Sequence, residues 1–383
     1  MAEDTRVLDL AGLQALIDTL GHQGYTVIGP TVRDGAIVNA PISSLDDLPR
    51  GIGDEQEAAH YRLRERADEA LFAFAAGAQS AKPVLFPPDE LLWRSRRTDD
   101  TTEIEIEIER ETKPASGPPY ALIGVRSCDL RAIQMHDQIL LERTAADFHY
   151  AARRAESFVV AVTCTDPAGT CFCASMNTGP SPRGGYDLAL TELYADGEHR
   201  FVVVVGTDRG AQVLAEVAPA TATDDDVAAA ERVTTEAAGR MGRELQTDGL
   251  KYLLYANAES PHWDEVAARC LSCTNCTLVC PTCFCTSVED VTDLTGVDAE
   301  RHRVWDSCFS EEFSYIHGGS VRESTRSRYR QWITHKLAAW EDQFGSFGCV
   351  GCGRCITWCP AGIDITAEAA TLRGVPPKTS QRS

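Results

Sequence analysis

The fold of the C-terminal half is decided by the stretch Cys270-Leu-Ser-Cys273-Thr-Asn-Cys276-Thr-Leu-Val-Cys280-Pro281. Its C-x2-C-x2-C-x3-C-P spacing recurs unchanged in Cys349-Val-Gly-Cys352-Gly-Arg-Cys355-Ile-Thr-Trp-Cys359-Pro360. Three thiolates spaced three residues apart on a tight loop can bind three irons of a cubane, and a more distant cysteine binds the fourth iron. The two arrays therefore predict two [4Fe–4S] clusters.

The spacing also predicts how the cysteines are shared between the clusters. In two-cluster ferredoxins the fourth cysteine of each run binds the other cluster. This crossing assigns the first cluster to Cys270, Cys273, Cys276 and Cys359, and the second cluster to Cys349, Cys352, Cys355 and Cys280. Structural zinc is the main alternative, but a zinc site takes four ligands in two pairs rather than two four-cysteine arrays. Attachment of c-type haem is excluded because no His follows a C-x-x-C pair.

Composition and charge narrow the class of protein. The 383 residues are 43% hydrophobic and 24% charged, which is typical of a globular chain with two domains. The net charge of −21 argues against binding to nucleic acid or to an anionic membrane. The acidic start MAEDTR and the short apolar runs lack an export or membrane signal, so we expect a cytoplasmic protein. Fifteen cysteines in a reducing compartment then indicate metal rather than disulfides.

Up to residue 220 the pattern predicts an α/β domain. Continuous apolar runs at 120–125, 158–162 and 201–205 are typical of buried strands, and helical patterns follow two of them at 129–142 and 208–217. A short strand is predicted at 24–28, closed by Gly29-Pro30, after a helical pattern at 8–17. Strict alternation predicts a half-buried strand at 102–109.

The rest of the chain divides into three parts. Residues 221–245 predict a linker helix, residues 246–370 a dicluster domain without a convincing strand, and residues 371–383 a mobile tail. The 68 residues between Cys280 and Cys349 are predicted to be helical, and this insert resembles the α-helical ferredoxin fold in iron–sulfur subunits of succinate dehydrogenases. The predicted fold is an α/β N-terminal domain followed by an α-helical ferredoxin-like dicluster domain.

Four further cysteines follow two of the predicted strands. They are Cys128, at the end of the first strand, and Cys164, Cys171 and Cys173, after the next one. Neighbouring parallel strands release their loops at one edge of a sheet, so these four thiols are predicted to hold a third [4Fe–4S] cluster in the first domain. The alternative is that they are reduced thiols packed as small apolar side chains.

Other chemistry-bearing residues are left without an assignment. Cys283, Cys285 and Cys308 form no complete ligand set, and alternative ligands, redox-active thiols and packing all remain open. A basic segment before the second array is interpreted as a solvated helix face, and the alternative is that it offsets cluster charge or contacts an acidic partner. It comprises Arg322, Arg326, Arg328, Arg330 and Lys336.

Over nearly its whole length the chain resembles one type of iron–sulfur subunit. This type is shared by cytoplasmic sulfhydrogenases, as the beta subunit of NAD(P)-linked nickel–iron hydrogenases, and by cytoplasmic anaerobic sulfite reductases, as their iron–sulfur component. Besides the second array, the resemblance is carried by the segments Ile28-Gly-Pro30, Lys82-Pro-Val-Leu-Phe-Pro-Pro88, Gly124-Val-Arg-Ser-Cys-Asp-Leu-Arg-Ala132, Thr170-Cys-Phe-Cys-Ala-Ser-Met176, Cys280-Pro-Thr-Cys-Phe-Cys285 and Trp305-Asp-Ser-Cys308.

The resemblance implies a non-catalytic electron-transfer subunit of an oxidoreductase complex. Such a subunit relays electrons between a flavin/NAD(P) partner and the small and large subunits of a nickel–iron hydrogenase. In the alternative complex it relays NADH electrons to a sirohaem sulfite reductase subunit. Neither G-x-G-x-x-G after a strand nor a P-loop occurs in this chain, so FAD and NAD(P) are expected on the partner.

Two other classes of function compete with this interpretation. One is a self-contained enzyme that binds a small substrate beside the first-domain cysteines and uses Cys308 as a thiol catalyst. The other is a metal-stabilised binding module without redox work, although the acidic charge removes nucleic acid as its ligand.

Overall fold

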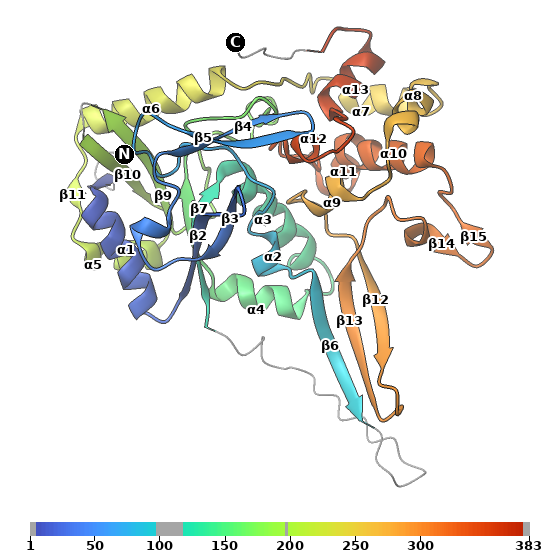
Figure 1. The fold of residues 1–383 in the computed structure, drawn as a ribbon, viewed down its shortest axis with the longest axis horizontal. Helices are drawn as coiled ribbons and strands as arrows, with labels where there is room; N and C mark the ends of the chain where they lie inside the picture. Colours follow the sequence, from blue (N-terminus) through green and yellow to red (C-terminus); the bar gives the residue numbers. More distant parts are fainter. Residues whose placement is uncertain (1–4, 97–117, 196–197, 378–383) are drawn as a thin grey trace.

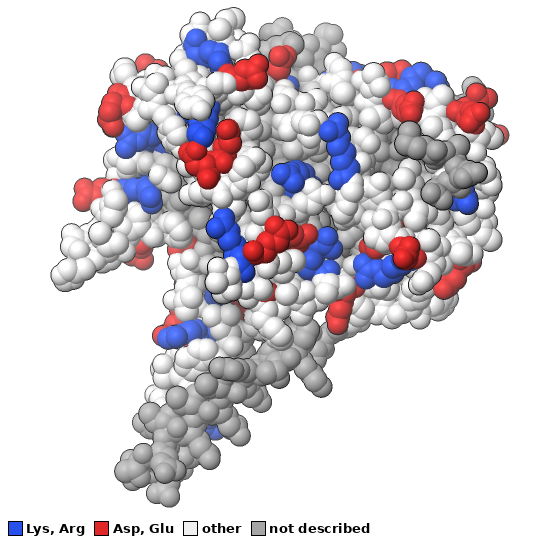
Figure 2. Space-filling model, turned by 180° about the vertical axis from the view of Figure 1, so that it is seen from behind, with Lys and Arg blue, Asp and Glu red and all other residues white. Residues whose placement is uncertain are grey.

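The structure is a computed structural model that describes residues 5–96, 118–195 and 198–377 (Figure 1). The strand predicted at 102–109 and the last six residues of the predicted tail lie outside the described residues. None of the described helices is long and apolar enough to cross a membrane. In Figure 2, which views the molecule from behind, basic and acidic side chains are interspersed over the visible face.

The N-terminal part is built on an eight-stranded sheet of order β11-β1-β10-β9-β8-β7-β2-β3. The strands β2, β7, β8 and β9 run parallel, and the outer pairs are antiparallel. The strands are β1 (Thr5–Leu8), β2 (Thr26–Arg33), β3 (Ala36–Pro41), β7 (Tyr120–Arg126), β8 (Phe158–Val162), β9 (Leu188–Ala195), β10 (Glu198–Val205) and β11 (Ala220–Thr221). The predicted α/β character of this part is confirmed.

Helices cover both faces of this sheet, which explains the continuous apolar runs. One face packs against α1 (Leu10–His22) and α5 (Asp208–Val217). The other face packs against α2 (Lys82–Leu85), α3 (Ser127–Leu140) and α4 (Phe148–Glu156). Side chains alternate between the two cores along β8, with Val160 on the first face and Val159 on the second. A strand buried on both sides has no polar face, so its sequence shows no alternation.

The strand β2 is longer than predicted. It does not end at Gly29-Pro30 but continues to Arg33 and turns back through Asp34-Gly35 into β3. Both turn residues have positive φ, as a tight hairpin requires. Pro30 pairs with Asn39 in this hairpin, so a proline that reads as a strand terminator lies inside a strand.

The C-terminal part is mainly helical and is connected to the sheet by α6 (Asp224–Gly239). Its core is formed by large apolar side chains such as Trp263, Trp332, Leu337 and Ile356. The helices are α7 (Leu250–Ala256), α8 (His262–Arg269), α9 (Asn275–Leu278), α10 (Thr325–Thr334), a π-helical turn (His335–Ala339), α11 (Trp340–Phe344), α12 (Arg354–Thr357) and α13 (Ile365–Arg373). The last of these extends into the predicted tail by three residues.

The insert between the two arrays is not wholly helical, which corrects the sequence-based expectation. It contains β12 (Thr286–Thr292) and β13 (Asp298–Trp305), and β13 pairs with β6 (Asp89–Arg96) from the N-terminal part. These three strands form a ribbon that projects from the molecule (Figure 1). A short hairpin, β14 (Tyr315–Ile316) with β15 (Gly319–Ser320), follows.

Charge rather than apolar alternation accounts for the ribbon. Arg94 donates to Glu300 at 2.7 Å, and Arg301 donates to Asp290 at 2.6 Å, in both cases across neighbouring strands. Cross-strand ion pairs stabilise a sheet without an apolar stripe, so the hydrophobic pattern gave no strand signal here.

The two parts of the chain are interlocked. The hairpin of β4 (Ile52–Glu57) and β5 (His60–Glu65) contacts the C-terminal part, where Ala59 N–H donates to the Ile356 carbonyl at 3.2 Å. The ring of Tyr61 stacks on Trp358, with 5.0 Å between centroids. The second cysteine array therefore folds against residues that are about 300 positions earlier in the sequence.

Candidate metal centres

The first predicted ligand set surrounds one cavity. Its cysteines come from the end of α8, from α9 and from the segment after α12. Aromatic and apolar side chains complete the wall, among them Phe309, Tyr329, Trp332 and Ile363. The four predicted ligands that line the cavity are Cys270, Cys273, Cys276 and Cys359. The structure thus places the last cysteine of the second array with the first three cysteines of the first array.

The second predicted set is gathered in the same crossed manner. Burial raises the pKa of the Cys349 thiol to about 12, and the nearby charges of Cys352 and Cys280 add to this shift. Burial also raises the pKa of Cys355, with further contributions from Cys349, Cys352 and Cys280. Cys280 therefore lies among the first three cysteines of the second array, in keeping with the predicted ligand set.

The donor chemistry of both sets fits an iron–sulfur cluster. Backbone N–H groups point at sulfur atoms, with 3.4 Å from Ser272 N to Cys270 Sγ, from Ile363 N to Cys359 Sγ and from Gly351 N to Cys349 Sγ. Such N–H donors tune the potential of thiolate-bound clusters. Among the described residues, no three His, Cys, Asp or Glu side chains are close enough to share a single metal ion.

Two buried lysines adjoin the second set. Lys336 Nζ donates to Cys280 Sγ at 3.2 Å and to Thr282 Oγ1 at 2.9 Å. Burial opposes its charge, but the neighbouring sulfurs of Cys280 and Cys283 outweigh burial and hold the pKa of Lys336 well above its usual value. Lys82 Nζ donates to the carbonyls of Leu278 and Cys283, both at 3.3 Å.

This location corrects the interpretation of the basic segment as a solvated helix face. Arg328 and Lys336 are buried, while Arg326 and Arg330 are partly exposed and pair with Glu259. Lys82 was missed altogether, although it lies in one of the segments that carry the family resemblance. A lysine between Ala81 and Pro83 has no sequence signal that distinguishes it from a surface lysine.

Three of the four first-domain cysteines, Cys128, Cys171 and Cys173, lie near Cys352 of the second set, and Cys164 lies near Cys171 and Cys173. Burial raises the pKa of Cys173, and the charges of Cys171, Cys164 and Cys352 raise it further. Burial likewise raises the pKa of Cys128, which is also affected by Cys352 and Cys173. The strands β7 and β8 that carry these loops are parallel neighbours, as the sequence argument required. A third ligand set next to Cys352 remains a proposal.

Glycines let the two cysteine loops approach each other. Gly351 and Gly353 have φ of 65° and 77°, which L side chains rarely adopt. A Cβ on Gly351 would lie 2.7 Å from the backbone of Cys173, and a Cβ on Gly353 would lie 2.5 Å from the Thr170 carbonyl oxygen. Phe172 N–H donates to the Gly351 carbonyl at 2.9 Å. The loop 170–173 is therefore part of the wall around the second set.

Iron analysis tests the third set. We expect about twelve irons and about twelve acid-labile sulfides per chain in anaerobically purified protein, at four per cubane. The Cys171→Ser variant should lose about four irons, because it removes one of the four predicted ligands. A value near eight in the unmodified protein, unchanged in Cys171→Ser, would show that the first-domain thiols are packing residues.

The three unassigned cysteines adjoin the same region. Cys285 precedes β12 and Cys308 follows β13, so the hairpin brings them together, and Asp306 N–H donates to the Cys285 carbonyl at 2.9 Å. A hydrogen bond from the Cys308 thiol, opposed by burial and assisted by Lys336, lowers the pKa of Cys285 to about 7. In the same way, a hydrogen bond from the Cys283 thiol lowers the pKa of Cys280. The pair of Cys285 and Cys308 thus depends on the register of the β12–β13 hairpin, which the sequence did not predict.

A buried ion pair links the second array to the first-domain cysteines. The Arg354 side chain is 1% exposed and donates to both carboxylate oxygens of Asp129, at 2.5 and 2.8 Å. It also donates to the carbonyls of Gly77 and Gln79, at 2.6 and 3.0 Å. Asp129 directly follows Cys128, and Arg354 lies between Cys352 and Cys355. The pair fixes the two cysteine segments relative to each other.

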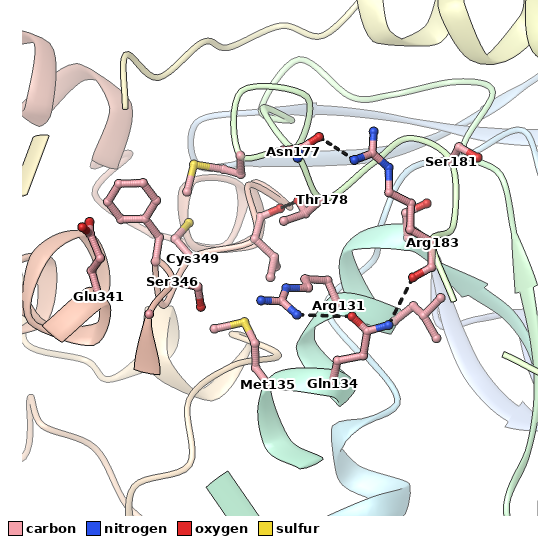
Figure 3. A pocket seen from close by; sticks show the side chains of 16 residues that line it. Arg131, Gln134, Met135, Asn177, Thr178, Ser181, Arg183, Glu341, Ser346 and Cys349 are labelled. Carbon is pink, nitrogen blue, oxygen red and sulfur yellow. Dashed lines mark hydrogen bonds between the residues drawn. The ribbon is translucent and has the colours of Figure 1, made fainter. Parts of the chain in front are cut away.

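A pocket of about 480 Å³ lies beside Cys349 (Figure 3). Figure 3 shows the guanidinium groups of Arg131 and Arg183 on its polar side, where they donate to Gln134 and Asn177 at 3.3 and 2.7 Å. Met135 and Phe347 contribute apolar wall. Cys349, a predicted ligand of the second set, therefore lines a pocket at the molecular surface.

Comparison with known proteins gives the class first. Residues 269–363 match the family model of a 4Fe-4S dicluster domain, and this range contains all eight cysteines of the first and second sets. The chain is therefore an iron–sulfur protein with a 4Fe–4S dicluster domain. Over 325 residues it is 30% identical to sulfhydrogenase 2 subunit beta of Pyrococcus furiosus, and the match covers 84% of this chain and 91% of the relative. The chain belongs to the family of sulfhydrogenase beta subunits.

Proposed function

We propose that this chain is the electron-transfer iron–sulfur subunit of a hydrogenase-type complex, with no substrate chemistry of its own. The observation that carries the proposal is the crossed pair of thiol sets, which lie side by side. Cys280 of the second set is close enough to Cys276 of the first set to raise the pKa of Cys276, and Cys355 also lines the first cavity. Clusters bound at these two sets would exchange electrons at short range.

The two sets reach the surface at different places, which is what a relay requires. Cys273 of the first set is exposed. Cys349 of the second set borders the pocket in Figure 3. The aromatic side chains of Phe309 and Trp332, which line the first cavity, are almost fully buried and would shield a cluster there from water. The protein thus supplies two accessible ends and a dry interior.

We further propose that the first-domain thiols extend the relay as a third centre. Cys128 and Cys173 both lie near Cys352 of the second set. In this proposal the dicluster domain, residues 246–370, is ferredoxin-like in its crossed ligation, and the α/β domain, residues 1–220, carries the third centre. The α6 segment, within 221–245, connects them.

The partners follow from the family. The relative is named as the beta subunit of a sulfhydrogenase, so the proposed partners of this chain are a nickel–iron module and a flavin/NAD(P) subunit. The chain's own residues would bind the clusters, position the pocket beside Cys349 and keep water away from the sulfurs. The alternative that the sequence resemblance implies is a complex with a sirohaem sulfite reductase subunit.

Isolation of the native complex tests the partner assignment. We expect purification through a tag on this chain to yield nickel, flavin and hydrogen-dependent reduction of NAD or NADP, because the relay would connect these reactions. The chain alone should accept electrons from dithionite with bleaching of its visible absorbance and should show no turnover of its own. A complex with a sirohaem spectrum and no nickel would contradict the hydrogenase assignment.

A further inference from the structure

We propose that Lys336 is a positioning residue that gives the cluster of the second set a higher reduction potential than the cluster of the first set. The inference rests on the proposed function, since it assumes that both sets carry [4Fe–4S] clusters. It adds which of the two clusters holds the electron at equilibrium. The structural basis is an asymmetry of charge around two otherwise similar thiol sets.

The contacts of Lys336 are those of an ammonium group held against a ligand sulfur. Its Nζ donates to Cys280 Sγ at 3.2 Å, to Thr282 Oγ1 at 2.9 Å and to the Gly348 carbonyl at 3.4 Å. Three acceptors match the three hydrogens of an ammonium. The residue is 3% exposed, so solvent does not screen this charge.

The local fold aims Lys336 at this position. It lies in the π-helical turn His335–Ala339, between α10 and α11, and its own carbonyl accepts the Gly348 N–H at 2.7 Å. Gly348 immediately precedes Cys349, the first cysteine of the second array. The side chain and the backbone of Lys336 therefore contact both array segments that contribute to the second set, which ties its charge to that set.

A second buried lysine lies beside the same segment of the first array. Lys82 Nζ donates to the carbonyls of Leu278 and Cys283, which flank Cys280, and lies 3.7 Å from the ring centroid of Trp305. Among the described residues neither lysine forms an ion pair with a carboxylate. Burial lowers the pKa of Lys82, whose Nζ contacts carbonyl oxygens and not a sulfur, so the charge held directly against the second set is that of Lys336.

The surroundings of the first set are different. The sulfurs of Cys270 and Cys359 accept hydrogen bonds from the neutral N–H groups of Ser272 and Ile363. Arg269 lies near Cys359, but Glu368 pairs with it at 2.7 Å. Arg354, which lies near Cys352 of the second set, is similarly paired with Asp129. Arg328 in α10 is buried as well, but among the described residues no hydrogen bond joins it to a ligand sulfur. The direct contact of a cationic side chain with a ligand sulfur is therefore that of Lys336, on the second set.

Electrostatics then gives the direction. Reduction adds a negative charge to a cluster, and an adjacent buried cation stabilises the added charge more than it stabilises the oxidised form. The second cluster should therefore be reduced first, and an electron that reaches the first cluster should pass to it. Of these two clusters, the second, which lies beside the pocket at Cys349, would hold the electron at equilibrium.

A redox titration followed by electron paramagnetic resonance tests the proposal on the full, cluster-loaded chain. We expect the second-cluster signal to appear at higher potential than the first-cluster signal. In Lys336→Met the equilibrium constant for reduction of the second cluster should fall at least tenfold, which is about 59 mV for a one-electron couple. The first-cluster midpoint should move much less. The signals are assigned with Cys280→Ser, expected to lack the second cluster, with Cys276→Ser, expected to lack the first, and with Cys171→Ser, expected to lack any cluster of the third set.

Two further variants separate charge from structure. Lys336→Gln keeps a hydrogen-bond donor for Cys280 but removes the charge, so it should lower the second-cluster midpoint as Lys336→Met does. It provides the test if Lys336→Met loses iron. Lys251→Met removes a lysine that pairs with Asp342 on the surface and should leave both midpoints unchanged. The inference would be overturned if, in an iron-replete Lys336→Gln protein, the equilibrium constant for reduction of the second cluster changed by less than threefold. Absence of both signals from the unmodified chain would instead contradict the proposed function.

Discussion

The Cys280→Ser variant is expected to lose the cluster held by Cys349, Cys352 and Cys355, while the cluster of its own array remains. Cys280 lies among the second-array cysteines and accepts a hydrogen bond from Lys336 at 3.2 Å. A serine hydroxyl is a poor substitute for a thiolate ligand, so iron should fall by about four per chain. Iron analysis and electron paramagnetic resonance of the reduced protein measure the loss.

The crossed assignment of ligands is tested by comparing variants of two cysteines from the same array. Cys276→Ser changes a residue four positions away and should abolish the other signal, because Cys276 lines the first cavity. Cys349→Ser should match Cys280→Ser, and the Cys280→Ser/Cys349→Ser double variant should lose no more iron than either single variant. If Cys280→Ser and Cys276→Ser abolished the same signal, each array would hold its own cluster and the crossing would be wrong.

Replacement of Arg354 by leucine is expected to destabilise the protein by about 3–5 kcal/mol, because it leaves the Asp129 carboxylate buried without its partner. The pair is bidentate, and the Arg354 side chain is 1% exposed. Loss of the Arg354 guanidinium also removes the hydrogen-bond donor to the carbonyls of Gly77 and Gln79. The midpoint of urea unfolding, followed by bleaching of the visible absorbance, should fall accordingly.

The controls for this prediction separate a buried pair from an exposed one. Arg301→Leu breaks an exposed cross-strand pair with Asp290 and should lower the midpoint far less than Arg354→Leu, since solvent screens such pairs. The double variant Arg354→Leu/Asp129→Leu should be more stable than Arg354→Leu alone, because no unpaired charge remains. Equal midpoints for Arg354→Leu and Arg301→Leu would show that the buried pair does not hold the two parts together.

Some features could be predicted because they depend on residues that are close in sequence. The C-x2-C-x2-C-x3-C-P arrays identify an iron–sulfur protein, and the match of residues 269–363 to a 4Fe-4S dicluster domain confirms this class. The runs at 120–125 and 158–162 identify buried strands because a strand covered on both faces must be apolar throughout. The family resemblance is confirmed by the sulfhydrogenase beta subunit relative.

Other features were missed because their signal is not apolar. The strands β12 and β13 carry charged side chains, and β13 pairs with β6, a partner about 200 residues away in sequence. Local periodicity therefore favoured a helical insert, and the placement of Cys285 next to Cys308 at the base of the hairpin could not be foreseen. The same holds for the continuation of β2 through Pro30, which depends on pairing with β3.

The sequence by itself thus determined the class of protein, the cofactor type and the α/β character of the first part, because ligand spacing and apolar runs are local properties. Only the tertiary structure decided which charges surround the ligands. Lys82, Lys336 and Arg354 look like any other basic residues in the sequence, yet all three are buried beside cysteines that the chain brings together from distant segments. Burial and the distance between charges depend on the packing of the whole chain, so the electrostatics of this site belongs to the fold.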